Sequence, residues 1–127
     1  MRMIEILPAP DHVVALRLTG TLTADDYDQA VKETETKLQQ HRRIGVYVDM
    51  AGFDDMTAEA AAKHMPYSRI MLGAADRFPR KAVVTDKQWV RILIGALDPL
   101  ASDSESRAFG PGAREKAMAW ASEIPHP

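Results

Sequence analysis

Residues 44–50 read IGVYVDM, a nearly continuous apolar run that is rich in β-branched side chains. Such a run is typical of a strand that is buried on both faces, as in the centre of a parallel sheet. A second run of this kind, KAVVT at residues 81–85, follows a segment that can form a helix. We therefore expect a sheet in which 44–50 is the central strand and helices connect the strands.

Further strands are expected on both sides of this run in the sequence. Residues 3–7 and 12–19 are separated by the turn-forming stretch PAPD, and they predict an antiparallel pair whose second strand ends at Gly20. Residues 105–109 predict an edge strand near the C-terminus.

The segments between the strands have the residue spacing of helices. Residues 23–26, TADD, offer a hydroxyl and a carboxylate for a capping box, so an amphipathic helix should begin there. Thr57 can cap the next helix, which Pro66 should kink or break because proline lacks the amide donor. A third helix should occupy residues 87–97, and the last should follow Pro111.

The expected order of elements is β-β-α-β-α-β-α-β-α. This order predicts an α/β fold with a single mixed sheet of about five strands and flanking helices. No internal repeat and no long linker divides the chain. We therefore expect residues 1–127 to form one domain, with residues 122–127 as a tail.

The composition of the chain excludes several classes of function. The chain has 127 residues, 46% of them apolar and 27% charged, a net charge of −2 and no cysteine. Without cysteine there can be no disulfide, no thiol catalysis and no cysteine metal site. A slightly acidic chain has no overall attraction to nucleic acid or to an anionic membrane, and no apolar run approaches the ~20 residues of a membrane helix. The N-terminal run, interrupted at Glu5, is too short for a signal peptide, so we expect a cytoplasmic protein with no nucleic-acid partner and no stable membrane insertion.

Several stretches carry a family resemblance through their order and spacing. They are residues 3–7 (MIEIL), 12–20 (HVVALRLTG), 22–27 (LTADDY), 46–49 (VYVD) ahead of Phe53, 81–89 (KAVVTDKQW), and the set Arg107, Phe109, Arg114, Glu115, Ala117 and Trp120. With them the chain resembles the SpoIIAA-like family of small bacterial proteins. That family is related to STAS domains and, through a shared α/β topology, to the lipid-binding SEC14 (CRAL-TRIO) fold.

The resemblance implies a non-catalytic binding or regulatory module that acts through protein–protein contacts, either with a protein partner or with a second copy of itself. In the anti-sigma-factor antagonists of the STAS branch, a serine in the loop after the central strand is phosphorylated to switch partner binding. The corresponding stretch here looks like residues 49–52, DMAG, in which Met50 stands where the serine would be. The resemblance therefore implies no switch of that kind. Thr57, the nearest hydroxyl, is interpreted as a helix cap.

The expected helix at residues 87–97 carries apolar side chains on more than one stripe, which a helix lying on a sheet does not need. The extra apolar surface can be buried under a neighbouring helix, form a dimer interface or line the lip of an apolar pocket. Methionines near the end of the central strand suit a surface that adapts to varied partners, although core filling is their more common role. The candidate ligand or partner surface comprises Met50, Phe53, Met56, Met65, Tyr67, Trp89, Leu93 and Leu97.

A basic cluster lies close to this helix in the sequence. Arg80, Lys87 and Arg91 could bind a carboxylate or phosphate group, although a solvated surface is the plainer interpretation. An apolar wall with a cationic rim would suit a small amphiphile or lipid, so SEC14-like binding of such a molecule is the alternative function. By analogy with SEC14-like proteins, a helix broken at Pro66 could then act as a lid.

The sequence offers no constellation that is typical of a metal site or a catalytic centre. The histidines have no carboxylate or second histidine at ligand spacing, and the aspartates within residues 25–28 are explained by the helix dipole. Asp54 and Asp55, in an expected loop beside Gly52, could do acid–base chemistry, but solvated loop carboxylates are much more common. We therefore expect no metal, no cofactor and no enzyme activity.

Overall fold

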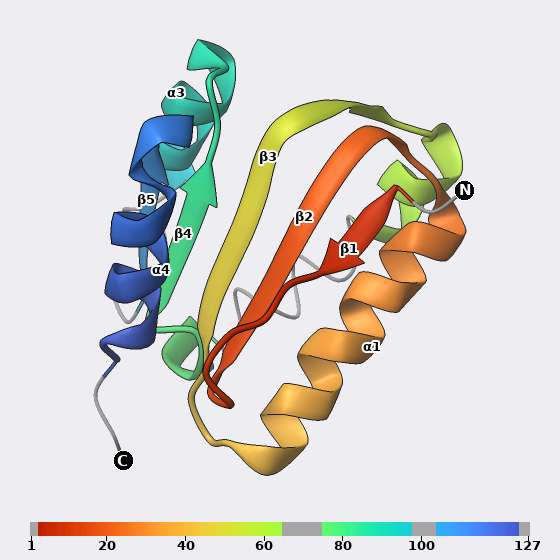
Figure 1. Cartoon of the computed structure of the whole chain (residues 1–127). Helices are drawn as coiled ribbons and strands as arrows, with labels where there is room; N and C mark the ends of the chain where they lie inside the picture. The colour runs from red at the N-terminus through yellow and green to blue at the C-terminus, as the bar shows by residue number, and fades with distance from the viewer. Residues whose placement is uncertain (1–2, 65–74, 98–103, 125–127) are drawn as a thin grey trace.

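The computed structural model describes residues 3–64, 75–97 and 104–124, which contain one sheet of 5 strands in the order β1-β2-β3-β4-β5 (Figure 1). The strands are β1 (Ile4–Ile6), β2 (Val13–Leu22), β3 (Gly45–Met56), β4 (Arg80–Val84) and β5 (Glu105–Phe109). β1 is antiparallel to β2, and the later strands are parallel to their neighbours. The expected mixed sheet, with β3 as its central strand, is confirmed.

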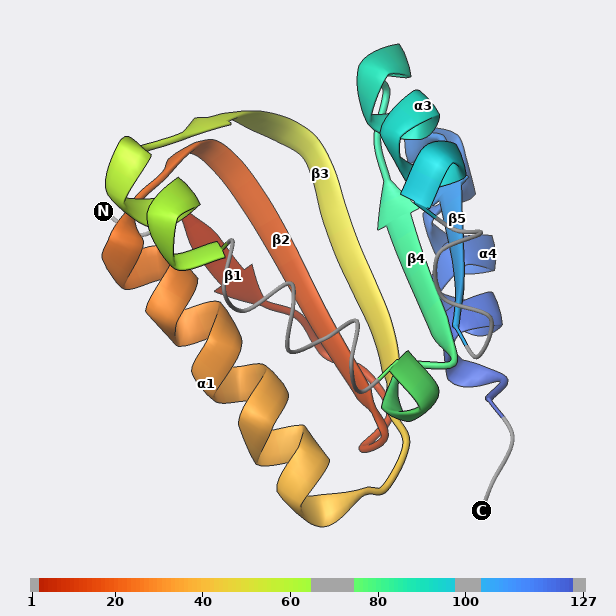
Figure 2. The same cartoon turned by 180° about the vertical axis from the view of Figure 1, so that it is seen from behind.

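Helices lie on both faces of this sheet. The helical elements are α1 (Ala24–Gln40), residues 58–64, η1 (Ala75–Arg77), α3 (Gln88–Leu97), η3 (Pro111–Ala113) and α4 (Arg114–Ser122). α1 and α3 cover the face that is turned to the viewer in Figure 2, and α4 covers the opposite face. Parallel neighbouring strands require a crossover connection, which explains why a helical segment follows each of β2, β3 and β4.

Side chains satisfy the free backbone groups at both ends of α1. Thr23 Oγ1 accepts from Asp26 N at 3.3 Å and the Asp26 carboxylate accepts from Thr23 N at 3.1 Å, which confirms the expected capping box. At the other end, Arg77 Nη2 donates to the carbonyl oxygens of Leu38 at 2.7 Å and His41 at 3.2 Å. Arg77 therefore holds η1 against the C-terminus of α1.

Apolar clusters on both faces of the sheet hold the layers together. The cluster under α4 comprises Val13, Ala15, Tyr47, Ala82, Val84, Ala117 and Ala121. A second cluster comprises Ile4, Val14, Leu16, Ile44 and Phe78, with Ala30 and Leu38 of α1 packed against it. Gly45 allows the close approach of α4, because a Cβ atom at this position would collide with the carbonyl group of Ala121.

β2 and β3 are longer than the sequence predicts. β2 continues through Gly20, which has a φ of 62°, as far as Leu22, and β3 continues to Met56. The two strands stay paired to these ends through register shifts. The prediction that Asp54 and Asp55 lie in a loop is therefore wrong, because pairing with β2 keeps them in the sheet.

The central strand is more deeply buried on one face than on the other. Tyr47 and Asp49 are buried beneath α4, whereas Val46 and Val48 on the opposite face are half-buried. The predicted break at Pro66 lies outside the described residues. Among the residues that the structure describes, no helix has both the length and the apolar content that a membrane crossing requires.

Candidate functional site

Two large apolar side chains are exposed side by side on α3. Trp89 and Ile92 have 55% and 65% of their surface exposed, more than any other large apolar residue in the described part of the chain. Residues three positions apart lie on the same side of a helix, so the two side chains form one apolar surface. Val90, in contrast, is buried. The second apolar stripe expected for this helix is therefore directed to solvent at Trp89 and Ile92.

Charged side chains border this apolar pair, and we call the pair with Asp86, Lys87 and Arg91 the α3 surface. Lys87 Nζ lies 4.0 Å from Asp86 Oδ1, and Arg91 Nη2 lies 3.5 Å from the carbonyl oxygen of Thr85. A hollow of about 430 Å³ is lined by Asp86, Gln88, Arg91 and Ile92. The α3 surface therefore offers apolar contact and both signs of charge within one small area.

The other residues of the predicted surface lie elsewhere or outside the described part of the chain. Phe53 is buried against Leu22, Tyr27 and Ala60, where it packs as a core residue. Met50 and Met56 are half-buried and pack against the same cluster. Met65 and Tyr67, together with the side chains of Leu93 and Leu97, are outside the described residues.

The structure does not bring the three predicted anion-binding residues together. Lys87 and Arg91 belong to the α3 surface, but Arg80 lies at the opposite end of β4, on the α4 side. Arg80 Nη1 donates to the carbonyl oxygen of Trp120 at 2.9 Å, and its guanidinium carbon lies 5.0 Å from the centre of the Trp120 ring. Arg107 approaches the same ring to 4.9 Å. Arg80 therefore takes part in a cation–π cluster that anchors α4.

A buried carboxylate on β3 is the most prominent electrostatic feature of the α4 face. Asp49 Oδ2 accepts from Arg114 Nε at 2.8 Å and lies 3.5 Å from Arg17 Nε, while Asp49 Oδ1 accepts from Ala51 N at 3.1 Å. The Asp49 side chain is 2% exposed, whereas the two arginine side chains are 45% and 41% exposed. Arg17 also contacts Glu5 Oε1 at 3.2 Å. This charged chain connects β1, β2 and β3 with α4.

The surroundings of Asp49 decide its ionisation. Burial by itself would raise the pKa of Asp49, but the Arg114 hydrogen bond, the Ala51 amide and the two positive charges outweigh burial and lower it. Burial and the nearby Asp49 charge raise the pKa of Tyr47. The sequence analysis did not predict that Asp49 forms a buried ion pair. The feature that could have indicated it is an aspartate inside an apolar strand, because a buried carboxylate needs a cation nearby.

Comparison with known proteins identifies the family. The family model described as SpoIIAA-like matches residues 13–122. The chain belongs to the SpoIIAA-like family. A crystal structure of an uncharacterized DUF3478-family protein with a SpoIIAA-like fold, from Shewanella loihica PV-4, is similar in fold, with a TM-score of 0.70 and 21% sequence identity over 92% of this chain and 90% of that chain. The comparison with curated proteins gives no match.

Within this SpoIIAA-like chain, the stretch that resembles the STAS phosphorylation loop is part of the sheet. Residues 49–52 belong to β3, and Met50 is half-buried there. Thr57 Oγ1 accepts from Ala60 N at 3.1 Å, as expected of a helix cap. The hydroxyl closest to this stretch in the sequence therefore stabilises a helix start.

The acidic and histidine side chains of this SpoIIAA-like domain are dispersed. No three of them gather in a way that could hold a metal ion within residues 3–64, 75–97 and 104–124. Asp54 and Asp55 are both exposed on β3, and Asp49 forms ion pairs with Arg17 and Arg114. The three carboxylates of β3 therefore differ in their surroundings, because Asp49 is held in ion pairs and Asp54 and Asp55 are exposed to solvent.

Proposed function

We propose that this SpoIIAA-like domain is a non-catalytic binding module that acts through protein–protein contacts, and that the α3 surface is its contact site. The exposure of Trp89 and Ile92 is the observation that carries the proposal. Burying a large apolar side chain gains about 1.5–3 kcal/mol, so this pair can stabilise a complex. Tryptophan and arginine are also the residue types that most often dominate the energy of protein interfaces.

A second copy of the chain is a suitable partner for this surface. Asp86 and Arg91 carry opposite charges and both line the hollow beside Ile92. In a two-fold contact, the same surface faces itself, so each Arg91 can approach the Asp86 of the other copy. The apolar pairs of the two copies would then meet between these charges.

Native mass spectrometry of the freshly purified protein, followed by denaturing extraction, tests this proposal. We expect a dimer, and we expect Ile92→Asp to weaken it because a carboxylate would enter the apolar contact. Ala119→Asp is the matched control, since Ala119 is an exposed helical residue on the opposite face of the sheet. A dimer that survives Ile92→Asp would contradict the site. A retained amphiphile that is lost in Ile92→Asp would favour SEC14-like binding instead.

A further inference from the structure

The indole ring of Trp89 is exposed and has no polar partner in the described part of the chain. Its exposed fraction is 55%, and within the described residues neither its N–H group nor its ring makes a hydrogen bond, a cation–π contact or a ring contact. The other tryptophan, Trp120, shows what such a ring can bind, since the guanidinium carbons of Arg80 and Arg107 lie 5.0 and 4.9 Å from its centre. Trp89 therefore keeps a donor and an aromatic face for a second molecule.

The hollow on the α3 surface offers the groups that this ring lacks. It has a volume of about 430 Å³ and is lined by Asp86, Gln88, Arg91 and Ile92. Arg91 can stack on an indole ring, because a guanidinium donates within its plane, as to the Thr85 carbonyl oxygen, and keeps its face for the ring. The Asp86 carboxylate can accept from the indole N–H group. Ile92 adds an apolar wall, so the hollow is complementary to tryptophan.

Trp89 cannot enter the hollow of its own chain. Gln88, Arg91 and Ile92 are three or four positions apart, so they lie on one side of α3. Trp89 is two positions from Arg91, and residues with this spacing do not face each other on a helix. Ile92 thus has Trp89 on one flank and the hollow on the other. The ring can therefore meet such a hollow only on a second molecule.

We propose that two copies of the chain exchange their Trp89 side chains, each ring entering the hollow of the other copy, where it stacks on Arg91 and packs on Ile92. This inference rests on the proposed function, because it uses the α3 surface as a contact between copies. A two-fold axis along α3 near Ile92 brings each ring opposite the hollow of the other copy, so both insertions form together. Aromatic side chains that fill pockets in this way are typical energetic centres of interfaces.

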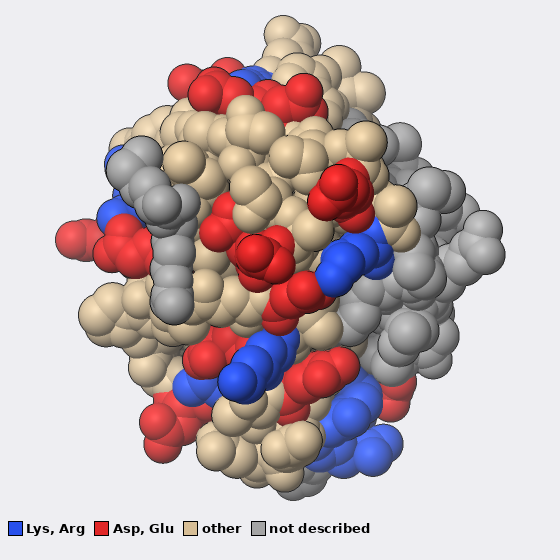
Figure 3. All heavy atoms as spheres, turned by 90° about the vertical axis from the view of Figure 1, so that its right-hand side faces the viewer, with Lys and Arg blue, Asp and Glu red and all other residues tan. Residues whose placement is uncertain are grey.

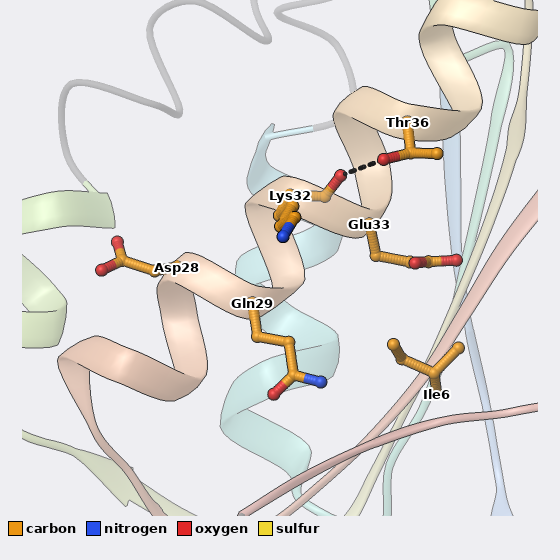
Figure 4. Close-up of a pocket in the computed structure, with 6 residues that line it drawn as sticks. All are labelled: Ile6, Asp28, Gln29, Lys32, Glu33 and Thr36. Atoms are coloured by element: carbon orange, nitrogen blue, oxygen red, sulfur yellow. Dashed lines mark hydrogen bonds between the residues drawn. The ribbon is translucent and has the colours of Figure 1, made fainter.

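A second hollow, between β1 and α1, is a poorer site for this ring. It has a volume of about 470 Å³ and is lined by Ile6, Asp28, Gln29, Lys32, Glu33 and Thr36 (Figure 4). Its cation is the compact ammonium group of Lys32, whereas the planar guanidinium of Arg91 can stack on a ring. Acidic and basic side chains are interspersed on this side of the molecule (Figure 3), so its charge selects no partner. Lys32 therefore offers a control position.

Native mass spectrometry of two mixed variants, at a concentration where the wild type is dimeric, tests the exchange. Trp89→Ala keeps the hollow and lacks the ring, whereas Arg91→Glu keeps the ring and alters the hollow. In the heterodimer one ring meets one intact hollow, which neither homodimer provides. Substitutions that act independently give random pairing. We expect the heterodimer to exceed random pairing by about threefold or more, as expected for one cation–π contact.

Trp89→Ala mixed with Lys32→Glu is the control for this experiment. Lys32→Glu makes the same change of charge as Arg91→Glu, but Lys32 lines the hollow beside β1. Both the ring and the α3 hollow stay intact in this variant, so we expect random pairing with Trp89→Ala.

Several results would overturn the exchange of Trp89. Random pairing of Trp89→Ala with Arg91→Glu would do so, and a preference for homodimers would mean that the two Trp89 rings contact each other instead. An equal heterodimer excess in the Lys32→Glu mixture would mean a general effect of charge. In each of these cases a wild-type dimer that Ile92→Asp weakens would leave the proposed function standing. A wild type that stays monomeric would contradict the dimer and the exchange together.

Discussion

The Asp49 carboxylate is charged inside the sheet because two arginines and one backbone amide compensate its burial. Arg114 arrives from α4 and Arg17 from β2, so the ion pairs form only when three elements are in place. A buried carboxylate that loses its partners is strongly destabilising. Because the folded-state pKa of Asp49 is lowered, its ionisation favours the folded state. The pH dependence of stability should therefore report this residue directly.

Asp49→Asn should lower the free energy of unfolding at pH 7 by about 1–3 kcal/mol, because the amide cannot satisfy both guanidinium groups. The folded-state pKa of Asp49 lies below its unfolded value. Its stabilisation is therefore complete above the unfolded pKa of about 3.9 and is lost as the pH falls through the folded pKa. Urea unfolding between pH 7 and pH 2 should show the two proteins converging in acid.

Asp54→Asn is the control for this experiment, since Asp54 is exposed on the same strand and its replacement should change the free energy of unfolding by no more than about 0.5 kcal/mol. A difference between wild type and Asp49→Asn that stays constant down to the lowest pH would contradict the role given to the Asp49 charge.

Gly45→Ala should destabilise the protein by about 1–3 kcal/mol, because the added methyl group would overlap the backbone of Ala121 and push α4 away. Gly112→Ala is the matched control, since no atom lies within 4 Å of the position that its Cβ would occupy. Thermal unfolding of the two variants checks the prediction, and an equal loss in both would show that the α4 contact is not the cause.

Helix α1 shows how local chemistry fixes an element. Thr23 and Asp26 form the capping box that the sequence predicts. Burial alone would raise the pKa of Asp26, but the hydrogen bonds that its carboxylate accepts from Thr23 and Met3 lower the pKa. Thr23→Ala should reduce the free energy of unfolding by about 1 kcal/mol. Thr36→Ala, at an exposed position within the same helix, should cost much less. Equal effects in chemical denaturation would argue against the cap.

The sequence predicts the elements better than their ends. Apolar runs and caps depend on neighbouring residues, so the order of strands and helices could be predicted. The continuation of β3 through Asp54 and Asp55 depends on backbone pairing with β2, which lies far away in the chain. Two exposed acids and a glycine predict a loop locally, but the partner strand decides otherwise.

For the candidate site, too, features that depend on neighbouring residues could be predicted, whereas contacts between distant parts of the chain could not. The excess of apolar side chains on α3 indicated a surface, and Trp89 lies on it. Arg80 is close to Lys87 and Arg91 in sequence but is drawn to Trp120 by the packing of α4. Asp49 and Arg114 are 65 residues apart, so their contact could not be inferred from spacing. Contacts between layers are decided by the fold as a whole.

Ile92→Asp should separate folding from binding in the intact molecule. The side chain is 65% exposed, so its replacement should change the free energy of unfolding of the monomer by no more than about 0.5 kcal/mol. Contact through the α3 surface should nevertheless be lost. Denaturant unfolding at a protein concentration where both proteins are monomeric, and native mass spectrometry at a higher concentration, check the two parts. A large loss of monomer stability would show that Ile92 belongs to the core.

Site-specific photo-crosslinking in cells of the host organism tests most directly whether the α3 surface contacts protein. A photoreactive phenylalanine analogue would replace Ile92 in one strain and Ala119 in another, since Ala119 is exposed on the opposite face. We expect a discrete protein adduct, of this chain or of one partner, from position 92 and none from position 119. The absence of a protein adduct at position 92, or equal adducts at both positions, would contradict it.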